Sequence, residues 1–484
     1  PGATAAAPPP AAPPPPPPAP PPKEPPPTRG RIVANAALVR GLVEVRPAGP
    51  QVAEISLEGG VQLTEEPLEA GDGPSLSISG DQAQVTRPAG FDAKALVSGR
   101  PARVAGRGME LEGPLVEFDR GLNRVTVDGA GRMRLPAGGG AGFEALAVAP
   151  TKAEGPAAGQ SSPPTASAAG DEPLEVVWQG RMDFDGLTAR FIDRVVTHSG
   201  DSTLEAGSLD VVLDGPIDFS PAGGPSSDDR QVARVACGGG VRIRTVGQGD
   251  DGSRSVERLY TRDLVLDRVS GDVVGNGPGR LESVRLGQPP GMPAVPGESG
   301  GPQAAAPPRP DELNFLGIDF QRGLRGNIGR RILEFHQRVE AIFGPVASWE
   351  ETLDPHDPRG LPPRAVRIST DTLGAGQSPP MPGRQRATLE LYAQGNVLVE
   401  GESFTGRSSR LRWSEAKDLI VFEGDGRTDA QLYRQMKVGA PTSTASAGKI
   451  LFWRSLDRID IHDARYLDLD QINASATGLR PPGS

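Results

Sequence analysis

The residues of this chain that are best suited to catalysis are few and scattered. An enzyme needs titratable groups that converge on one point, and the best candidates are Asp354-Pro355-His356-Asp357 and His462-Asp463. The first group contains Asp-Pro steps, which are typical of turns, so we interpret it as a surface loop. His462 alternates with Ile459 and Ile461, which places it on the solvent side of a strand. Neither group predicts an active site.

The sequence also does not predict a zinc site, a cysteine nucleophile or a phosphate-binding loop. The four histidines (His198, His336, His356 and His462) do not have the spacing of zinc ligands. The single cysteine, Cys237, excludes an internal disulfide framework, and we expect a small buried residue there rather than a nucleophile. Gly238-Gly239-Gly240 is not followed by the Lys-Ser/Thr of a phosphate-binding loop and predicts a bend between strands. We therefore expect a protein that is not an enzyme and that needs no cofactor and no metal.

Composition and charge narrow the class of protein. The net charge of −10 and the pI of about 5.2 argue against nucleic acid as a partner, because contact with phosphates needs a basic face. A chain of 484 residues is too long for one compact core. Glycine and proline, with 64 and 52 residues, are concentrated in certain segments, which predicts ordered β units separated by linkers. The sequence contains no run of 18 apolar residues, so it predicts no transmembrane helix.

The segment from Leu389 to Gly426 shows the pattern that organises the ordered parts. Its apolar residues fall mainly at odd positions, a period of two that predicts strands with one buried face. Gly395-Asn396 and Gly424-Asp425-Gly426 lie where the runs break, as expected for bulges or bends.

Parts of this pattern recur along the chain. Cys237 to Val241 matches Ala393 to Val397 at an offset of 395 − 239 = 156 residues, and Leu264-Val265-Leu266 matches Leu411-Arg412-Trp413. An Asp-Phe pair followed by Phe-x-x-Arg-Val occurs twice, as Asp183-Phe184 with Phe191 to Val195 and as Asp319-Phe320 with Phe335 to Val339. Such long-range repetition predicts duplicated domains. The match also favours a strand for Arg331 to Phe343, whose apolar spacing fits a helix as well.

These observations define the predicted domain organisation. The predicted parts are a Pro/Ala-rich tether (1–28), β unit 1 (29–136), a linker (137–172), β unit 2 (173–287), a linker (288–310), β unit 3 (311–476) and a tail (477–484). Residue 1 is Pro rather than Met, and we expect the tether to act as a spacer from a membrane anchor or upstream domain; the alternative is a disordered tail.

The sequence Ala393-Gln394-Gly395-Asn396-Val397, followed by a Leu-rich strand and a closing Gly-x-Gly, resembles the OstA-like, LptA-type family of lipopolysaccharide-transport proteins. The resemblance covers the three predicted units and is clearest in the third. It implies an all-β fold of tandem β-jellyroll units of antiparallel strands, located in the periplasm. It further implies binding of lipopolysaccharide or a related amphiphile, and end-to-end strand pairing with other domains of this type. Single-domain members of the family lack the long Pro-rich linkers seen in this chain.

An antiparallel sandwich that does not close leaves an apolar trough between its sheets. The residues expected to line this trough and to hold acyl chains are Val241, Ile243, Leu264, Leu266, Leu389, Leu391, Val397, Val399, Leu411, Trp413, Leu419 and Val421. The alternative is a filled core without a ligand, in a structural scaffold of the cell envelope. A carbohydrate-active enzyme would need clustered carboxylates near exposed aromatic residues, and Trp413 falls instead in the apolar register.

Overall fold

The structure is a computed structural model that consists of antiparallel β-strands. It describes residues 31–47, 49–66, 77–88, 92–106, 109–135, 174–217, 231–248, 254–286, 312–378, 388–402, 404–414, 417, 419–435, 442–453 and 458–468. The predicted tether, both predicted linkers and the predicted tail lie outside these ranges. Within them every strand pairing is antiparallel, which confirms the all-β prediction. The described residues contain no helix with the length and apolar character needed to cross a membrane.

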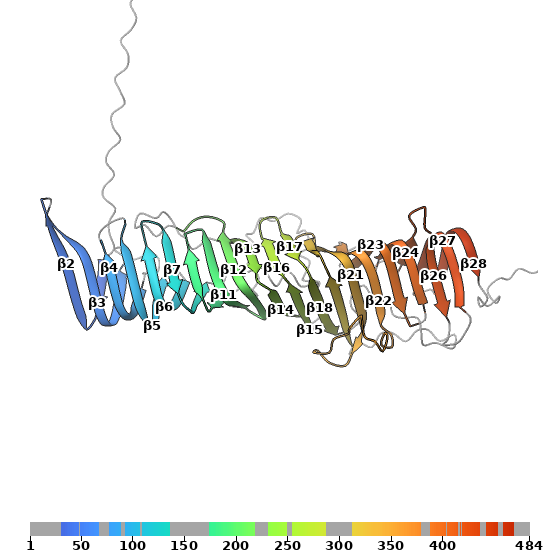
Figure 1. Cartoon of the computed structure of the whole chain (residues 1–484), viewed down its shortest axis with the longest axis horizontal. Coiled ribbons are helices and arrows are strands. Elements are labelled where there is room, and N and C mark those ends of the chain that lie inside the picture. Colours follow the sequence, from blue (N-terminus) through green and yellow to red (C-terminus); the bar gives the residue numbers. More distant parts are fainter. Residues whose placement is uncertain are drawn as a thin grey trace, which may run out of the picture.

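The strands follow one another along the long axis of the molecule, from the N-terminal to the C-terminal end (Figure 1). The first fourteen are β1 (Arg31–Asn35), β2 (Leu38–Arg46), β3 (Gly49–Glu66), β4 (Ser77–Thr86), β5 (Lys94–Gly106), β6 (Met109–Asp119), β7 (Arg124–Asp128), β8 (Gly131–Leu135), β9 (Leu174–Trp178), β10 (Arg181–Phe184), β11 (Thr188–Ser199), β12 (Ser202–Leu213), β13 (Val232–Gly238) and β14 (Val241–Gln248). The others are β15 (Arg254–Thr261), β16 (Asp263–Asp267), β17 (Asp272–Asn276), β18 (Gly279–Leu286), β19 (Leu313–Phe320), β20 (Gly323–Asn327), β21 (Ile332–Val346), β22 (Val366–Ser378), β23 (Thr388–Gly401), β24 (Phe404–Ser414), β25 (Leu419–Glu423), β26 (Ala430–Gln435), β27 (Thr442–Trp453) and β28 (Arg458–Asp468).

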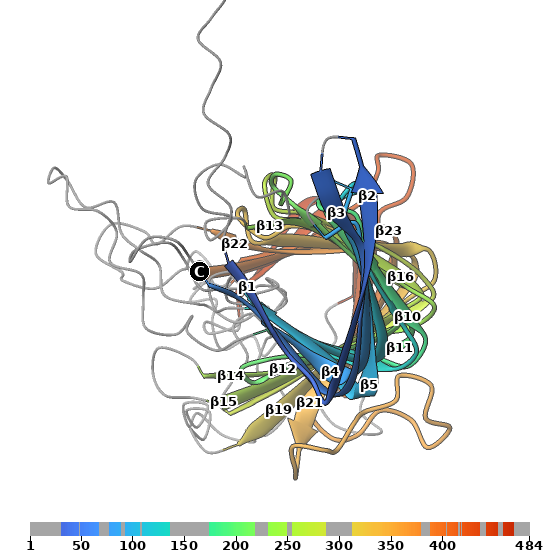
Figure 2. The same cartoon turned by 90° about the vertical axis from the view of Figure 1, so that its left-hand side faces the viewer.

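Strand pairing forms two walls that meet along one line. The first wall contains β2, β7, β10, β13, β16, β17, β20 and β25, and the second contains β1, β8, β9, β14, β15, β18, β19 and β26. Long strands such as β21 run through both walls: its first half pairs with β20 and its second half with β19. We call the line where the walls meet the bend line, the opposite edge of each wall its rim, and the space between the walls the trough. Figure 2 shows the walls from the end where β1 and β2 lie.

A short motif explains how a strand turns from one wall into the other. In β11 and β21 the two residues at the bend, Asp193-Arg194 and Gln337-Arg338, have φ between 46° and 70°, and the register shifts there. In β23 the same place is taken by Gly395-Asn396, and a Cβ on Gly395 would collide with the Asp371 side chain. Residues in this left-handed region break the pleat and kink the strand.

The residues on either side of the bend face the trough. Phe191 and Val195 flank the bend of β11, Phe335 and Val339 flank that of β21, and all four are buried. The repeated Phe-x-x-Arg-Val sequence is therefore the bend motif, and the strand predicted for Arg331 to Phe343 is confirmed as part of β21.

The Asp-Phe part of the predicted repeat is wrong. Phe184 ends β10 at the rim of the first wall, whereas Phe320 ends β19 beside the bend line of the second wall. The two pairs resemble each other in sequence because both end a strand with an inward aromatic residue.

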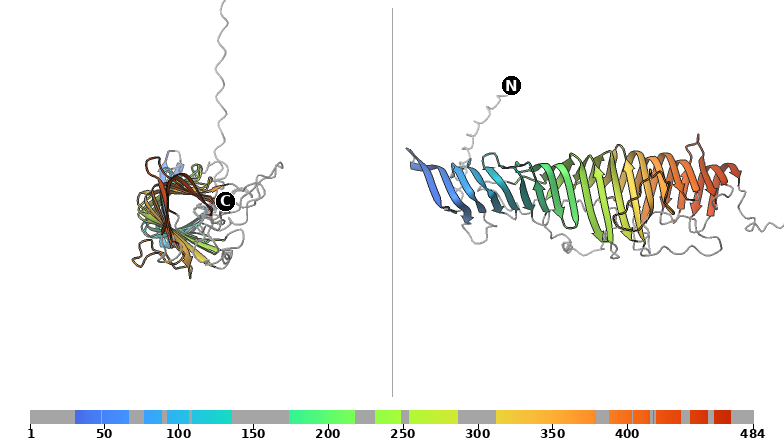
Figure 3. Two further views of the ribbon diagram at one scale, coloured as in Figure 1. Left: turned by 90° about the vertical axis from the view of Figure 1, so that its right-hand side faces the viewer. Right: turned by 60° about the horizontal axis from the view of Figure 1, so that its bottom comes forward.

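The three predicted β units share one sheet. Strands β7 and β8 of the first unit pair with β10 and β9 of the second, and β17 and β18 pair with β20 and β19. Figure 3 shows the strands side by side without a break along the axis. The predicted unit boundaries fall between the end of β8 at Leu135 and the start of β9 at Leu174, and between Leu286 of β18 and Leu313 of β19.

Candidate functional site

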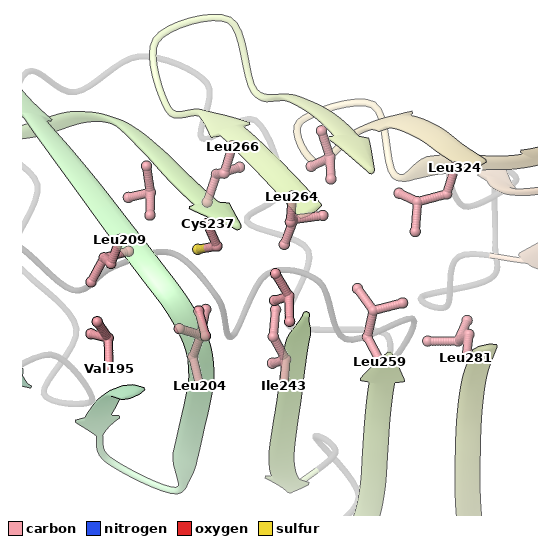
Figure 4. Packing of buried hydrophobic residues seen from close by; sticks show 14 of the residues in the cluster. Val195, Leu204, Leu209, Cys237, Ile243, Leu259, Leu264, Leu266, Leu281 and Leu324 are labelled. Atoms are coloured by element: carbon pink, nitrogen blue, oxygen red, sulfur yellow. The ribbon is translucent and has the colours of Figure 1, made fainter. Parts of the chain in front are cut away.

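The trough is lined by rows of apolar side chains that run along the whole described structure. Because directly opposite residues of paired strands share a face, the pairings define each row. A row of the first wall contains Leu209, Cys237, Leu264, Leu324, Phe335, Ala393, Leu411 and Phe422, and a row of the second wall contains Leu204, Ile243, Leu259, Leu281, Ile318 and Ala341. All belong to one continuous hydrophobic cluster. In Figure 4 labelled members of the two rows extend toward one another from facing strands.

Eight of the twelve predicted trough residues are deeply buried in this cluster. Val241, Ile243, Leu264, Leu266, Val397, Val399, Leu411 and Trp413 are only 1% to 5% exposed. In these parts the trough is filled by the protein's own side chains, and a ligand can enter only if the walls move apart. Leu391 is half-buried and packs against the same cluster. Leu389 lies on β23, and its side chain is outside the described residues.

Leu419 and Val421 face away from the trough, contrary to the prediction. Ile420 and Phe422 are the inward residues of β25, with 7% and 1% exposure, whereas Leu419 and Val421 are half-buried on the outer face. The cause is the pairing of β25 with β24, which places Ile420 opposite the inward Trp413. The sequence from Leu419 to Phe422 is apolar at every position, so alternation alone did not reveal its face.

The trough opens at its C-terminal end. A cavity of about 470 Å³ lies between the last strands, within the range of about 300–1,000 Å³ typical of ligand sites. Apolar side chains of both walls line it, and polar residues lie among them: Leu432, Arg434, Ser443, Thr444, Ala445, Ile459, Asp460, Ile461, His462 and Leu467. The sequence predicted strands here, but none of these residues was expected to line the trough, because the pairing of β26, β27 and β28 is not readable from alternation.

The N-terminal end presents an apolar edge. Every residue of β2 is exposed, among them Leu42 at 59%, Val43 at 52% and Val45 at 86%. Among the described strands β2 pairs only with β3, so its other edge carries unpaired backbone groups. Such an edge is a template for pairing with another strand.

A loop covers part of the outer face of the second wall. Residues 347–365, between β21 and β22, place Leu353 over Val284, Phe315 and Ile342, which form a second hydrophobic cluster. Three arginine side chains of the wall donate hydrogen bonds to loop carbonyls: Arg258 to Trp349 (3.3 Å), Arg280 to Leu353 (2.9 Å) and Arg367 to Pro355 (2.7 Å).

The residues considered as candidates for catalysis lie in a surface loop, in ion pairs or in the core. Asp354 to Asp357 lie in this loop, where His356 approaches Glu340 of β21 at 3.3 Å. Beneath the loop, burial raises the pKa of Asp319, against the opposing effect of its ion pair with Arg280. Burial also raises the pKa of Cys237 to about 12, so its thiol is neutral and a poor nucleophile.

The remaining candidates lie apart from one another. His462 is exposed on β28, although it borders the C-terminal cavity. Within the described ranges no group of three or more His, Cys, Asp or Glu residues is placed to hold a metal ion. Trp178 and Trp413 are buried, as expected of core residues, and Trp178 donates a hydrogen bond to the carbonyl of Gly129 (3.0 Å). Trp453 is half-buried on the outer face beneath Arg458.

Neither a scan against protein-family models nor a search of curated proteins found a match to this chain.

Proposed function

We propose that this protein is a non-catalytic lipid-binding bridge that holds the acyl chains of lipopolysaccharide or a similar amphiphile between its two walls, in the periplasm. The observation that carries the proposal is the cavity of about 470 Å³ at the C-terminal end, whose apolar side chains continue the apolar rows of the trough. Both walls supply its apolar lining, with Leu432 and Ala445 on one side and Ile459 and Ile461 on the other.

The energetics of the trough favour an acyl chain as its ligand. Each methylene removed from water contributes about 0.8 kcal/mol, so a chain of about twelve carbons gains on the order of 10 kcal/mol before ordering costs. The C-terminal cavity gives such a chain an entry point that requires no rearrangement.

The geometry also allows the filled parts of the trough to open. Across all the described strands, the first wall pairs with the second only through the bend line, and no strand pairing joins the rims. Separation of the rims therefore breaks contacts between side chains but no hydrogen bonds of the sheet.

The two ends support assembly with other domains of the same kind. The outer edge of β2 at one end and that of β28 at the other have no partner strand among the described residues. Strand addition at such edges supplies main-chain hydrogen bonds, so the trough of one molecule would continue into that of the next.

The filled centre favours a second candidate, a structural scaffold of the cell envelope. In that case the rows around Val241 and Leu264, each 1% exposed, are a conventional core. A lipid-binding bridge is expected to carry bound lipid when it is isolated, whereas a scaffold is not.

The test is native mass spectrometry of the full 484-residue chain expressed in a compartment that contains lipopolysaccharide, followed by organic extraction. We expect a bound amphiphile with fatty-acyl chains. Ala445→Phe, which fills the cavity, should reduce the bound fraction several-fold. Leu122→Phe, at a leucine that is 67% exposed between β6 and β7, is the control and should not. A wild-type protein that carries no lipid and takes up none when it is added would support the scaffold instead.

A further inference from the structure

The second wall carries a local polar block on its inner face. Near the bend line its strands are apolar, as in Leu204, Ile243, Leu259 and Leu281. Nearer the rim the same strands place six polar residues on the same face, which we call the rim block: Ser202, Thr245, Ser255, Glu257, Ser283 and Arg285.

The rim block is limited in extent. Along the axis, the next inward positions still include two buried polar residues, Ser199 opposite Ser202 and Asn314 opposite Arg285. Around and beyond them the inward positions are apolar, with Leu174 on one side and Leu316 and Phe343 on the other. The facing wall also offers apolar side chains, among them Val211 and Val273. The trough is therefore apolar on both sides beyond Ser199 and Asn314, and between them it is polar on only one wall.

Hydrogen bonds within the block leave one group unused. The Arg285 guanidinium donates to Glu257 and, from Nε, to the Ser283 hydroxyl (2.9 Å), and the Ser202 hydroxyl donates to Thr245 (3.3 Å). The Ser255 hydroxyl, in a residue only 5% exposed, has no hydrogen-bond partner in the described structure. Both a buried ion pair and an unsatisfied hydroxyl are unfavourable compared with apolar side chains, so stability alone does not explain the block.

We propose that the rim block binds the uncharged, hydroxyl-bearing headgroup of an amphiphile whose acyl chain lies on the adjacent apolar rows. This inference rests on the proposed function. The charges of Glu257 and Arg285 offset each other, so the block offers no net charge to an ionic headgroup. A hydroxyl group both donates and accepts, so a polyol can hydrogen-bond to the Glu257 carboxylate, the Arg285 guanidinium and the Ser255 hydroxyl together.

The test compares two amphiphiles with the same dodecyl chain, dodecyl maltoside and dodecylphosphocholine, each below its critical micelle concentration. Binding to the full-length wild type, Ser255→Ala and Ser408→Ala is measured by titration calorimetry. Ser408 is a matched control because its hydroxyl, in a residue 8% exposed, also lacks a partner but lies next to the bend line. Neither substitution removes a hydrogen bond seen in the structure, so both variants should fold.

We expect Ser255→Ala to weaken maltoside binding by roughly three- to tenfold, the contribution of one hydrogen bond, with no change for phosphocholine. Ser408→Ala should bind both amphiphiles like the wild type. Equal effects of Ser255→Ala on both amphiphiles, or no effect, would overturn the headgroup site and leave the proposed function intact. A wild type that binds neither amphiphile would overturn both.

Discussion

Trp413 of β24 and Ile420 of β25 lie directly opposite each other, and both side chains face the trough. The next residue, Val421, consequently faces outward. We expect Ile420→Asp to destabilise the C-terminal part of the sheet by about 3–5 kcal/mol, because it buries an unpaired charge. Val421→Asp should cost much less. Hydrogen exchange of the β24 and β25 amides measures the difference, and equal loss of protection in both variants would contradict the assigned register.

The covering loop should depend on Leu353, which anchors it to the outer face of the second wall. Leu353→Ala is expected to weaken this anchor by about 2–5 kcal/mol and to speed tryptic cleavage after Arg359 within the loop. Leu122→Ala, at a leucine that is 67% exposed, is the control and should leave cleavage unchanged. Slow cleavage in the Leu353 variant would show that the arginine hydrogen bonds hold the loop without the leucine.

Asp183 of β10, in the second predicted unit, accepts hydrogen bonds from Arg124 and Thr126 of β7, in the first predicted unit. Hydrogen bonds from Arg181, Arg124 and Thr126 lower the pKa of this β10 carboxyl to about 2, although partial burial opposes them. Since the folded-state pKa is lower than that of the unfolded chain, near 4, ionised Asp183 stabilises the fold above pH 4, and this contribution is lost as the pH falls toward 2.

We therefore expect the β7 and β10 amides to lose protection from hydrogen exchange as the pH falls through this window. Asp183→Asn should weaken protection at neutral pH and remove most of the pH dependence at this seam. The pairing of β26 with β27 serves as the internal control, because none of its paired residues is an Asp or Glu. An unchanged acid response in the variant would assign the effect to other carboxylates.

Cys237 should resist thiol reagents in the folded protein. Its pKa is raised to about 12 by burial, and Asp210 adds a smaller repulsive contribution. We expect no labelling by iodoacetamide at pH 8 under native conditions and complete labelling in denaturant, as followed by mass spectrometry. Rapid native labelling would mean that the walls separate readily at this position.

Self-association should depend on the exposed edge of β2. Replacing Val43 and Val45 together by lysine places charge on this edge, which discourages strand addition. We expect the double variant to form fewer oligomers than the wild type in sedimentation velocity experiments across a concentration series. Leu122→Lys is the control, because it adds charge away from both ends.

Alternation in the sequence was sufficient to predict strands and the inward residues wherever polar and apolar residues alternate strictly. In β23 this identified Val397 and Val399, and the repeat identified Val241 in β14. The bend motif was visible as a repeat because two residues in the left-handed region must lie between two inward side chains. Alternation cannot assign a face to an uninterrupted apolar strand such as β25, whose orientation is set by its partner.

The polar residues of the trough were missed for a related reason. Ser255 and Glu257 alternate with Val256 and Arg258, and a buried polar residue facing inward looks in sequence like one facing solvent. Only the cross-strand partners of β15 reveal its face. The C-terminal cavity likewise depends on how three consecutive strands, β26, β27 and β28, pair and bend.

The pairing between the predicted units has a consequence for how this architecture can lengthen. Leu135 is the partner of Leu174, and Leu286 is the partner of Leu313, so the chain leaves the rim and returns to the adjacent strand whatever the length of the intervening segment. The entropic cost of closing such a segment rises by only about 0.6 kcal/mol for each doubling of its length. Insertions at the rim are therefore tolerated at small cost. Duplication of two neighbouring strands that run through both walls adds length to the trough without altering the strands already present.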